Sequence, residues 1–84
     1  DEERGFETYR IVIQPGGSLE AQPHLPGAEE YVTVFAGEAE IGLPEETYRL
    51  ETGDSMRFPA DQPHSYRNPG AEEARLSMLI WYRG

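Results

Sequence analysis

The sequence of 84 residues contains no cysteine, so it has neither a disulfide framework nor a thiol nucleophile. It also lacks any apolar run close to the ~20 residues that a membrane-spanning helix needs. The first residues, Asp1-Glu2-Glu3-Arg4, have neither the basic nor the apolar region of a signal peptide. These absences make the cytoplasm the expected location and predict no membrane partner.

Basic residues are few: 7 Lys and Arg stand against 16 Asp and Glu, which gives a formal net charge of −9. Phosphate backbones and anionic lipids would repel such a chain, so we expect no direct contact between this domain and nucleic acid. The sequence also has no phosphate-binding glycine loop and no nucleophile paired with a base.

Turn residues divide the chain about every eight to twelve residues, and no helix-length period appears between them. This pattern predicts one all-β, antiparallel domain over residues 1–84, built as a sandwich or barrel. The expected strands are Phe6 to Ile13, Ser18 to Gln22, Tyr31 to Phe35, Glu38 to Leu43, Thr47 to Leu50, Ser55 to Phe58, a short strand that opens at His64, and Arg75 to Tyr82.

Side chains alternate between the two faces of a strand, which predicts the residues that point into the core. We expect Glu30, Val32 and Val34 to point inward, and His64 and Tyr66 to point inward from another strand. The opposite, outward side then carries the apolar residues Phe35, Leu79 and Trp81. On so small a chain these residues suggest a cover formed by a second sheet or a partner subunit, so a homodimer is expected.

The stretch from Gly53 to Asn68 resembles the second conserved motif of the cupins. Gly53, Pro59, His64 and Asn68 fall at the spacings of that motif, and only its inner glycine differs, being replaced by Asp61. We expect Asn68 to brace its own turn.

The first cupin motif is matched in part. His24, Glu30 and Gly37 fall on its pattern, whereas Pro26 stands where a second histidine would be. The resemblance covers nearly the whole chain and implies a small antiparallel double-stranded β-helix, the jelly-roll barrel of the cupins.

Three interpretations of the histidines remain open. The resemblance implies that His24, Glu30 and His64 could hold a divalent ion such as Zn, Fe, Mn or Ni, with Gln22 as a possible helper. Alternatively, the site has lost its metal, and the same three residues together with Tyr66 line a pocket for an organic ligand. In the third interpretation, the histidines only satisfy backbone groups near a loop.

Within the cupins, residues 23–32 and 57–70 resemble the C-terminal sensor domain of XRE-type helix-turn-helix regulators. This implies a non-enzymatic module that binds a small-molecule effector and acts on DNA through an attached helix-turn-helix domain. Loss of a histidine at Pro26 and a first residue other than methionine favour this view, with the domain as the C-terminal part of a longer chain. The alternatives are a metal-dependent cupin enzyme, of dioxygenase or isomerase type, and a structural dimerisation module.

Overall fold

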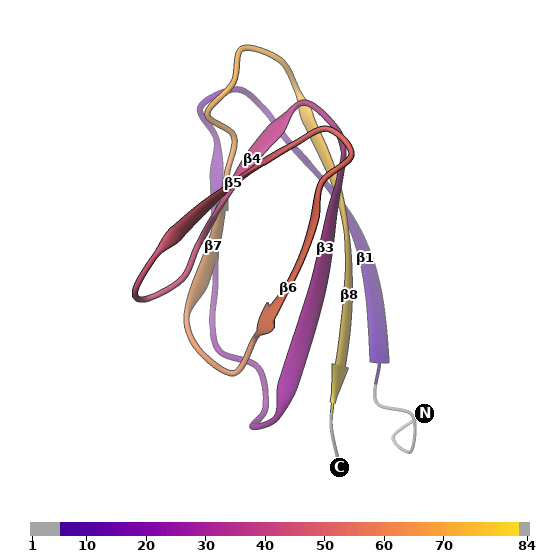
Figure 1. Ribbon diagram of the computed structural model, residues 1–84, viewed down its shortest axis with the longest axis vertical. Coiled ribbons are helices and arrows are strands. Elements are labelled where there is room, and N and C mark those ends of the chain that lie inside the picture. The colour runs from indigo at the N-terminus through magenta and orange to yellow at the C-terminus, as the bar shows by residue number, and fades with distance from the viewer. Residues whose placement is uncertain (1–5, 83–84) are drawn as a thin grey trace.

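A computed structural model describes residues 6–82 of the protein, which form eight strands (Figure 1). The strands are β1 (Phe6–Ile13), β2 (Ser18–Ala21), β3 (Ala28–Ala36), β4 (Glu38–Gly42), β5 (Thr47–Glu51), β6 (Ser55–Pro59), β7 (His64–Arg67) and β8 (Ala74–Tyr82). Over this range the chain forms no helix that could cross a membrane.

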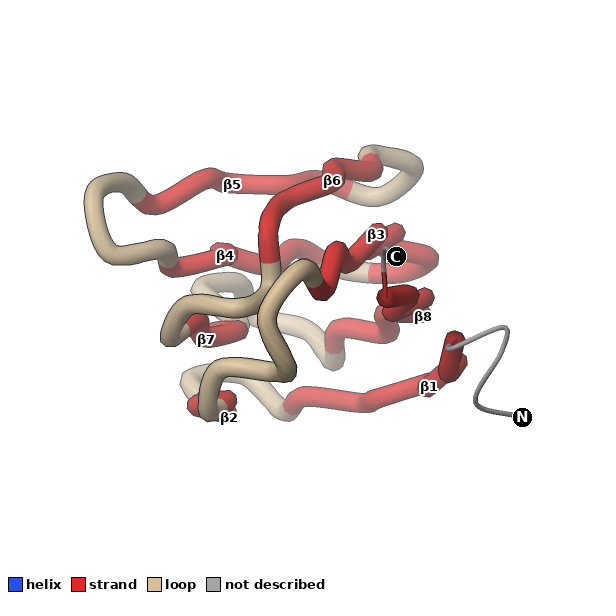
Figure 2. The backbone as a smooth tube through the Cα atoms, turned by 90° about the horizontal axis from the view of Figure 1, so that it is seen from below, coloured by secondary structure: helices blue, strands red, loops and turns tan. Residues whose placement is uncertain are grey.

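The strands form two antiparallel sheets of four strands each, in the orders β1-β8-β3-β6 and β2-β7-β4-β5. Viewed along the long axis, the sheets lie side by side as two layers (Figure 2). Every connection except the β4–β5 hairpin carries the chain from one sheet to the other. The predicted all-β jelly-roll architecture is thereby confirmed.

The predicted strand limits agree with the structure to within one residue, apart from the start of β3. This strand begins at Ala28 instead of Tyr31, because the Ala28 carbonyl accepts a hydrogen bond from the Ala60 amide at 2.9 Å. Strand β6 extends to Pro59, a residue without an N–H donor. Since β6 is an edge strand that pairs only with β3, this proline leaves no neighbouring ladder incomplete.

The core lies between the two sheets and follows the predicted alternation. Val32 and Val34 of β3 are fully buried, and Ile41 and Phe58 pack against them from β4 and β6. The inner side of β8 follows the same alternation through Leu76, Met78 and Ile80, which are all buried.

The outer face of the β1-β8-β3-β6 sheet is open to solvent and rich in apolar residues. Phe35 is 54% exposed and Leu79 is 36% exposed, and the guanidinium of Arg10 lies 5.8 Å from the Phe35 ring centre. The second sheet packs on the opposite, inner face. The expectation that a second sheet covers Phe35 was therefore wrong, and a partner subunit remains a prediction.

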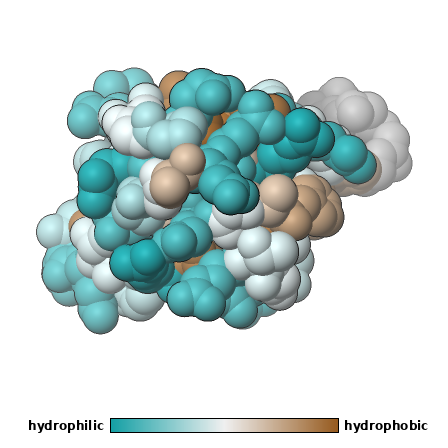
Figure 3. All heavy atoms as spheres, turned by 90° about the horizontal axis from the view of Figure 1, so that it is seen from above, coloured by the Kyte–Doolittle hydropathy of each residue, from teal (hydrophilic) through white to brown (hydrophobic). Residues whose placement is uncertain are grey.

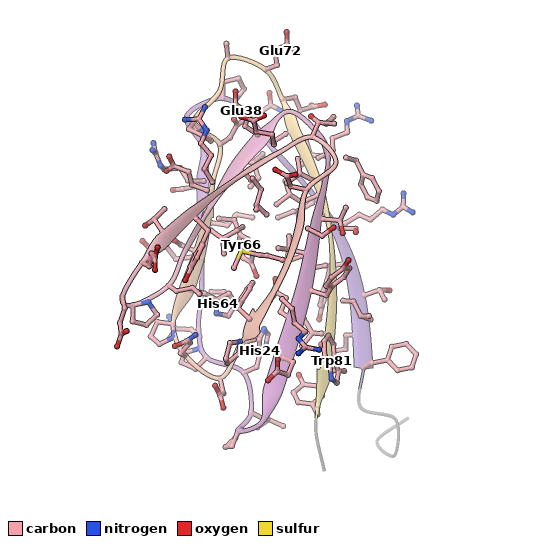
Figure 4. All side chains as sticks on the ribbon, in the orientation of Figure 1. His24, Glu38, His64, Tyr66, Glu72 and Trp81 are labelled. Atoms are coloured by element: carbon pink, nitrogen blue, oxygen red, sulfur yellow. The ribbon has the colours of Figure 1, made fainter. Side chains whose placement is uncertain are left out.

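Asn68 joins three loops at the end of the barrel that carries Glu72 in Figure 4. Its side-chain amide donates to the carbonyls of Ile13 at 2.9 Å and Glu72 at 2.7 Å, and its Oδ1 accepts from the Gly70 amide at 2.9 Å. Its main chain pairs with the turn at residues 16–17. The predicted turn-bracing role is confirmed, and it extends to the end of β1. The outer surface of this end is mainly hydrophilic (Figure 3).

We expect Asn68→Ala to lower the free energy of unfolding by about 1–3 kcal/mol, because it leaves buried backbone groups without partners. Gln14→Ala is the matched control: it removes an exposed side-chain amide and should change stability by less than about 0.5 kcal/mol. Urea denaturation followed by circular dichroism would measure both. Equal stabilities of the two variants would contradict the role given to Asn68.

Candidate functional site

A buried polar cluster lies inside the barrel, toward the end opposite Glu38 and Glu72 (Figure 4). His24 comes from the loop between β2 and β3, Glu30 from β3 and His64 from β7, so the two sheets both contribute. One ligand atom from each of these three residues lies within 4.8 Å of the other two. The structure thus brings together the three residues that the sequence predicted as a set.

Two loops that carry the histidines are held to each other. The His24 amide donates to the Ala60 carbonyl at 2.9 Å, and the Gly27 amide donates to Asp61 Oδ2 at 3.1 Å. Gly27 has a φ of 86°, a conformation that favours glycine. Asp61, which stands at the position of the inner glycine of the cupin motif, therefore positions the loop of His24. The sequence did carry a signal for this role of Asp61, which lies in a short loop between two prolines. An aspartate in such a loop often accepts a hydrogen bond from a backbone amide.

The Glu30 side chain is completely buried, and its two oxygens have different surroundings. Oε2 accepts a hydrogen bond of 2.5 Å from the Tyr66 hydroxyl. Burial raises the pKa of Tyr66 far above its usual value, and the nearby Glu30 carboxylate raises it further. Tyr66 therefore stays protonated and acts as the donor. Within residues 6–82, Oε1 has no hydrogen-bond partner.

The His64 ring is likewise buried and has one satisfied nitrogen. Nδ1 lies 2.8 Å from the Gln62 carbonyl oxygen, which can only accept, so Nδ1 carries a proton. Nε2 lies 3.5 Å from Glu30 Oε1 and has no hydrogen-bond partner among the described residues. Burial lowers the pKa of His64, but the Glu30 carboxylate and the Gln62 carbonyl more than offset this, and the pKa is raised overall.

Two unsatisfied atoms thus face each other in the interior, the carboxylate oxygen of Glu30 and the Nε2 of His64. When the ring is neutral both atoms are acceptors, so the pair calls for a proton or a cation between them. The ring centre of His24 lies 5.5 Å from that of His64, which adds a second imidazole. Two imidazoles and one carboxylate fit a divalent transition metal with open coordination positions.

This geometry bears on the three interpretations of the histidines. Satisfying a backbone group explains Nδ1 of His64 but leaves its Nε2 unexplained. Tyr66 borders the cluster as predicted, yet its hydroxyl is already used by Glu30. Gln22 and Pro26 are both exposed.

The chain is similar to known proteins over nearly its whole length. A family model described as "Cupin domain" matches residues 9–82. The crystal structure of the Cupin_2 domain of an XRE family transcriptional regulator from Enterobacter cloacae superposes with a TM-score of 0.92 and 34% sequence identity, covering 100% of this chain and 88% of that one.

Among curated proteins, the HTH-type transcriptional regulator SutR of Escherichia coli K12 is 35% identical over 77 residues. The match covers 92% of this chain but 43% of the regulator, so the chain spans less than half of that protein. Quercetin 2,3-dioxygenase of Bacillus subtilis is 38% identical over 63 residues, covering 73% of this chain and 19% of the enzyme. Regulator domains and an enzyme therefore share this sequence pattern.

Proposed function

Because the chain belongs to the Cupin_2 family, we propose that it is the small-molecule-sensing domain of a bacterial transcriptional regulator. The observation that carries this proposal is the match, over the full length of the chain, to the cupin domain of an XRE family regulator. In this proposal residues 1–84 form the C-terminal part of a longer chain, and a helix-turn-helix domain in that chain contacts DNA. The net charge of −9 supports a role without direct DNA contact.

The effector site in this proposal consists of His24, Glu30, His64 and Tyr66. Within residues 6–82, a buried oxygen of Glu30 and a buried ring nitrogen of His64 have no hydrogen-bond partner, which is costly to the fold and supports their retention for binding. A divalent ion such as Zn, Fe, Mn or Ni would be held by His24, Glu30 Oε1 and His64 Nε2. Once bound, it would supply a Lewis acid that polarises a ligand oxygen.

The second candidate function is a metal-dependent cupin enzyme of dioxygenase or isomerase type. It is favoured by the similarity to quercetin 2,3-dioxygenase and by a ligand set that leaves coordination positions open. Turnover of a candidate ligand by the 84-residue chain, or a full-length protein without a DNA-binding segment, would support the enzyme over the sensor.

We further propose that the domain forms a homodimer through the outer face of the β1-β8-β3-β6 sheet. Strand alternation and register place one acidic residue of the described chain on this face, Glu29, beside three arginines, Arg10, Arg57 and Arg75. On a chain with a net charge of −9, two copies could pack there without bringing many carboxylates together. The exposed rings of Tyr31 and Phe35, with other apolar side chains, supply area that a small core needs.

The first prediction from the proposed function concerns sensing in the full-length protein. The effector should change operator affinity by about 5–150-fold, the usual range of allosteric coupling. His24→Ala and His64→Ala should abolish this change and leave operator affinity without effector intact, because both residues lie in the binding site. Fluorescence anisotropy with labelled operator would measure both quantities. An effector response that survives both substitutions would refute the proposed site.

The second prediction concerns metal content. Protein purified without added metal should contain little, because Pro26 removes one imidazole from the family's ligand set. Pro26→His should raise occupancy, measured by elemental analysis, whereas the control Leu25→His places an imidazole one residue away and should not. Near-stoichiometric, tightly held metal in the unaltered protein would contradict the prediction.

The third prediction concerns association. Sedimentation at micromolar concentration should show a dimer, and Phe35→Glu should convert it to a monomer by placing a desolvated carboxylate in the interface. Leu25→Glu is the control, because Leu25 is 69% exposed and lies on a loop away from that face. A monomeric unaltered protein, or equal behaviour of the two variants, would reject this interface.

A further inference from the structure

We infer that Tyr66 is a positioning residue that restricts Glu30 to a single metal-binding oxygen. The inference rests on the proposed metal site and adds to it the role of a residue that supplies no ligand atom. It follows from Glu30 and His64, each of which has one atom bonded within the protein and, among residues 6–82, one atom without a hydrogen-bond partner.

The two oxygens of the Glu30 carboxylate have different neighbours. Its Oε2 accepts a hydrogen bond of 2.5 Å from Tyr66, and its Oε1 points toward the Nε2 of His64 at 3.5 Å. A carboxylate can bind a metal through one oxygen or through both. Because Oε2 is held by Tyr66, only Oε1 is presented to the position between Glu30 and His64.

Tyr66 is well suited to hold the Glu30 carboxylate in this orientation. It is 4% exposed, and its hydroxyl faces a carboxylate oxygen, so it serves as the donor of this hydrogen bond. Its ring also packs edge-on against His64, with ring centres 5.6 Å apart. One residue therefore fixes the orientation of the carboxylate and contacts the neighbouring imidazole.

His64 shows the same division between its two ring nitrogens: Nδ1 is bonded to the Gln62 carbonyl, whereas Nε2 has no hydrogen-bond partner in the part of the chain that the structure describes. Partners of this kind orient metal ligands, and their removal typically weakens metal binding about 10–100-fold. A one-oxygen Glu30 leaves an additional coordination position open, and an oxygen-bearing effector could occupy it.

The experiment titrates Co²⁺ into the 84-residue chain and records its visible absorption, which reports the number and type of ligands. Tyr66→Phe should weaken Co²⁺ binding about 10–100-fold and alter the spectrum, because Oε2 becomes free to coordinate. Tyr48→Phe is the matched control: it removes a tyrosine–glutamate hydrogen bond of 3.2 Å on the exposed β4–β5 hairpin and should change neither quantity. Thermal unfolding of both variants verifies that they fold.

A second measurement needs no variant. The Tyr66 hydroxyl proton, followed by NMR in the unaltered chain, should persist when Zn²⁺ is added, because Oε2 stays bound to Tyr66. Disappearance of this proton on Zn²⁺ binding would overturn the inference, as would unchanged Co²⁺ affinity and spectrum in Tyr66→Phe. Failure of the unaltered chain to bind either ion would also overturn it, while the effector response of the full-length protein would still test the sensing function separately.

Discussion

The hydrogen bond between Tyr66 and Glu30 is the interaction on which the interior of this domain depends, because it joins the two sheets through a buried carboxylate. An ionised carboxylate without partners would be very costly in an apolar core. Tyr66 satisfies one oxygen of Glu30 from the opposite sheet, and His64 places a ring nitrogen near the other. The sheets are thus held at a separation that suits both the packing around Val32 and the polar cluster.

Much of this site could be predicted from the sequence because strand geometry has a period of two. Glu30 lies two residues before Val32 on an alternating strand, and His64 lies two residues before Tyr66, so inward positions could be assigned without coordinates. Turn residues also located the strand ends, since proline and glycine restrict where a ladder can run. Motif spacing then related His24 to the other two residues.

Other features depend on contacts between distant segments and could not be predicted in this way. The early start of β3 reflects the pairing of Ala28 with Ala60, which lies 32 residues further along the chain. The selection of one atom in each ligand depends on a backbone carbonyl at Gln62 and on a hydroxyl across the barrel, and neither has a sequence signature. Asp61 had a local signal, but its partner Gly27 belongs to another loop.

Asn68 and the pair formed by Glu30 and His64 are buried polar groups at opposite ends of the barrel. Their hydrogen bonding indicates which group serves the fold and which serves binding. Asn68 is fully buried, and both its side-chain oxygen and its amide nitrogen are paired with backbone groups of adjoining loops. Both N–H donors of this side chain are used within the fold, and its oxygen also holds a backbone amide, so the residue stabilises the fold. Glu30 and His64 are equally buried, yet each keeps one atom without a hydrogen-bond partner within residues 6–82. A small domain has little stability to spare, so an unsatisfied pair persists best where a bound cation or effector completes it.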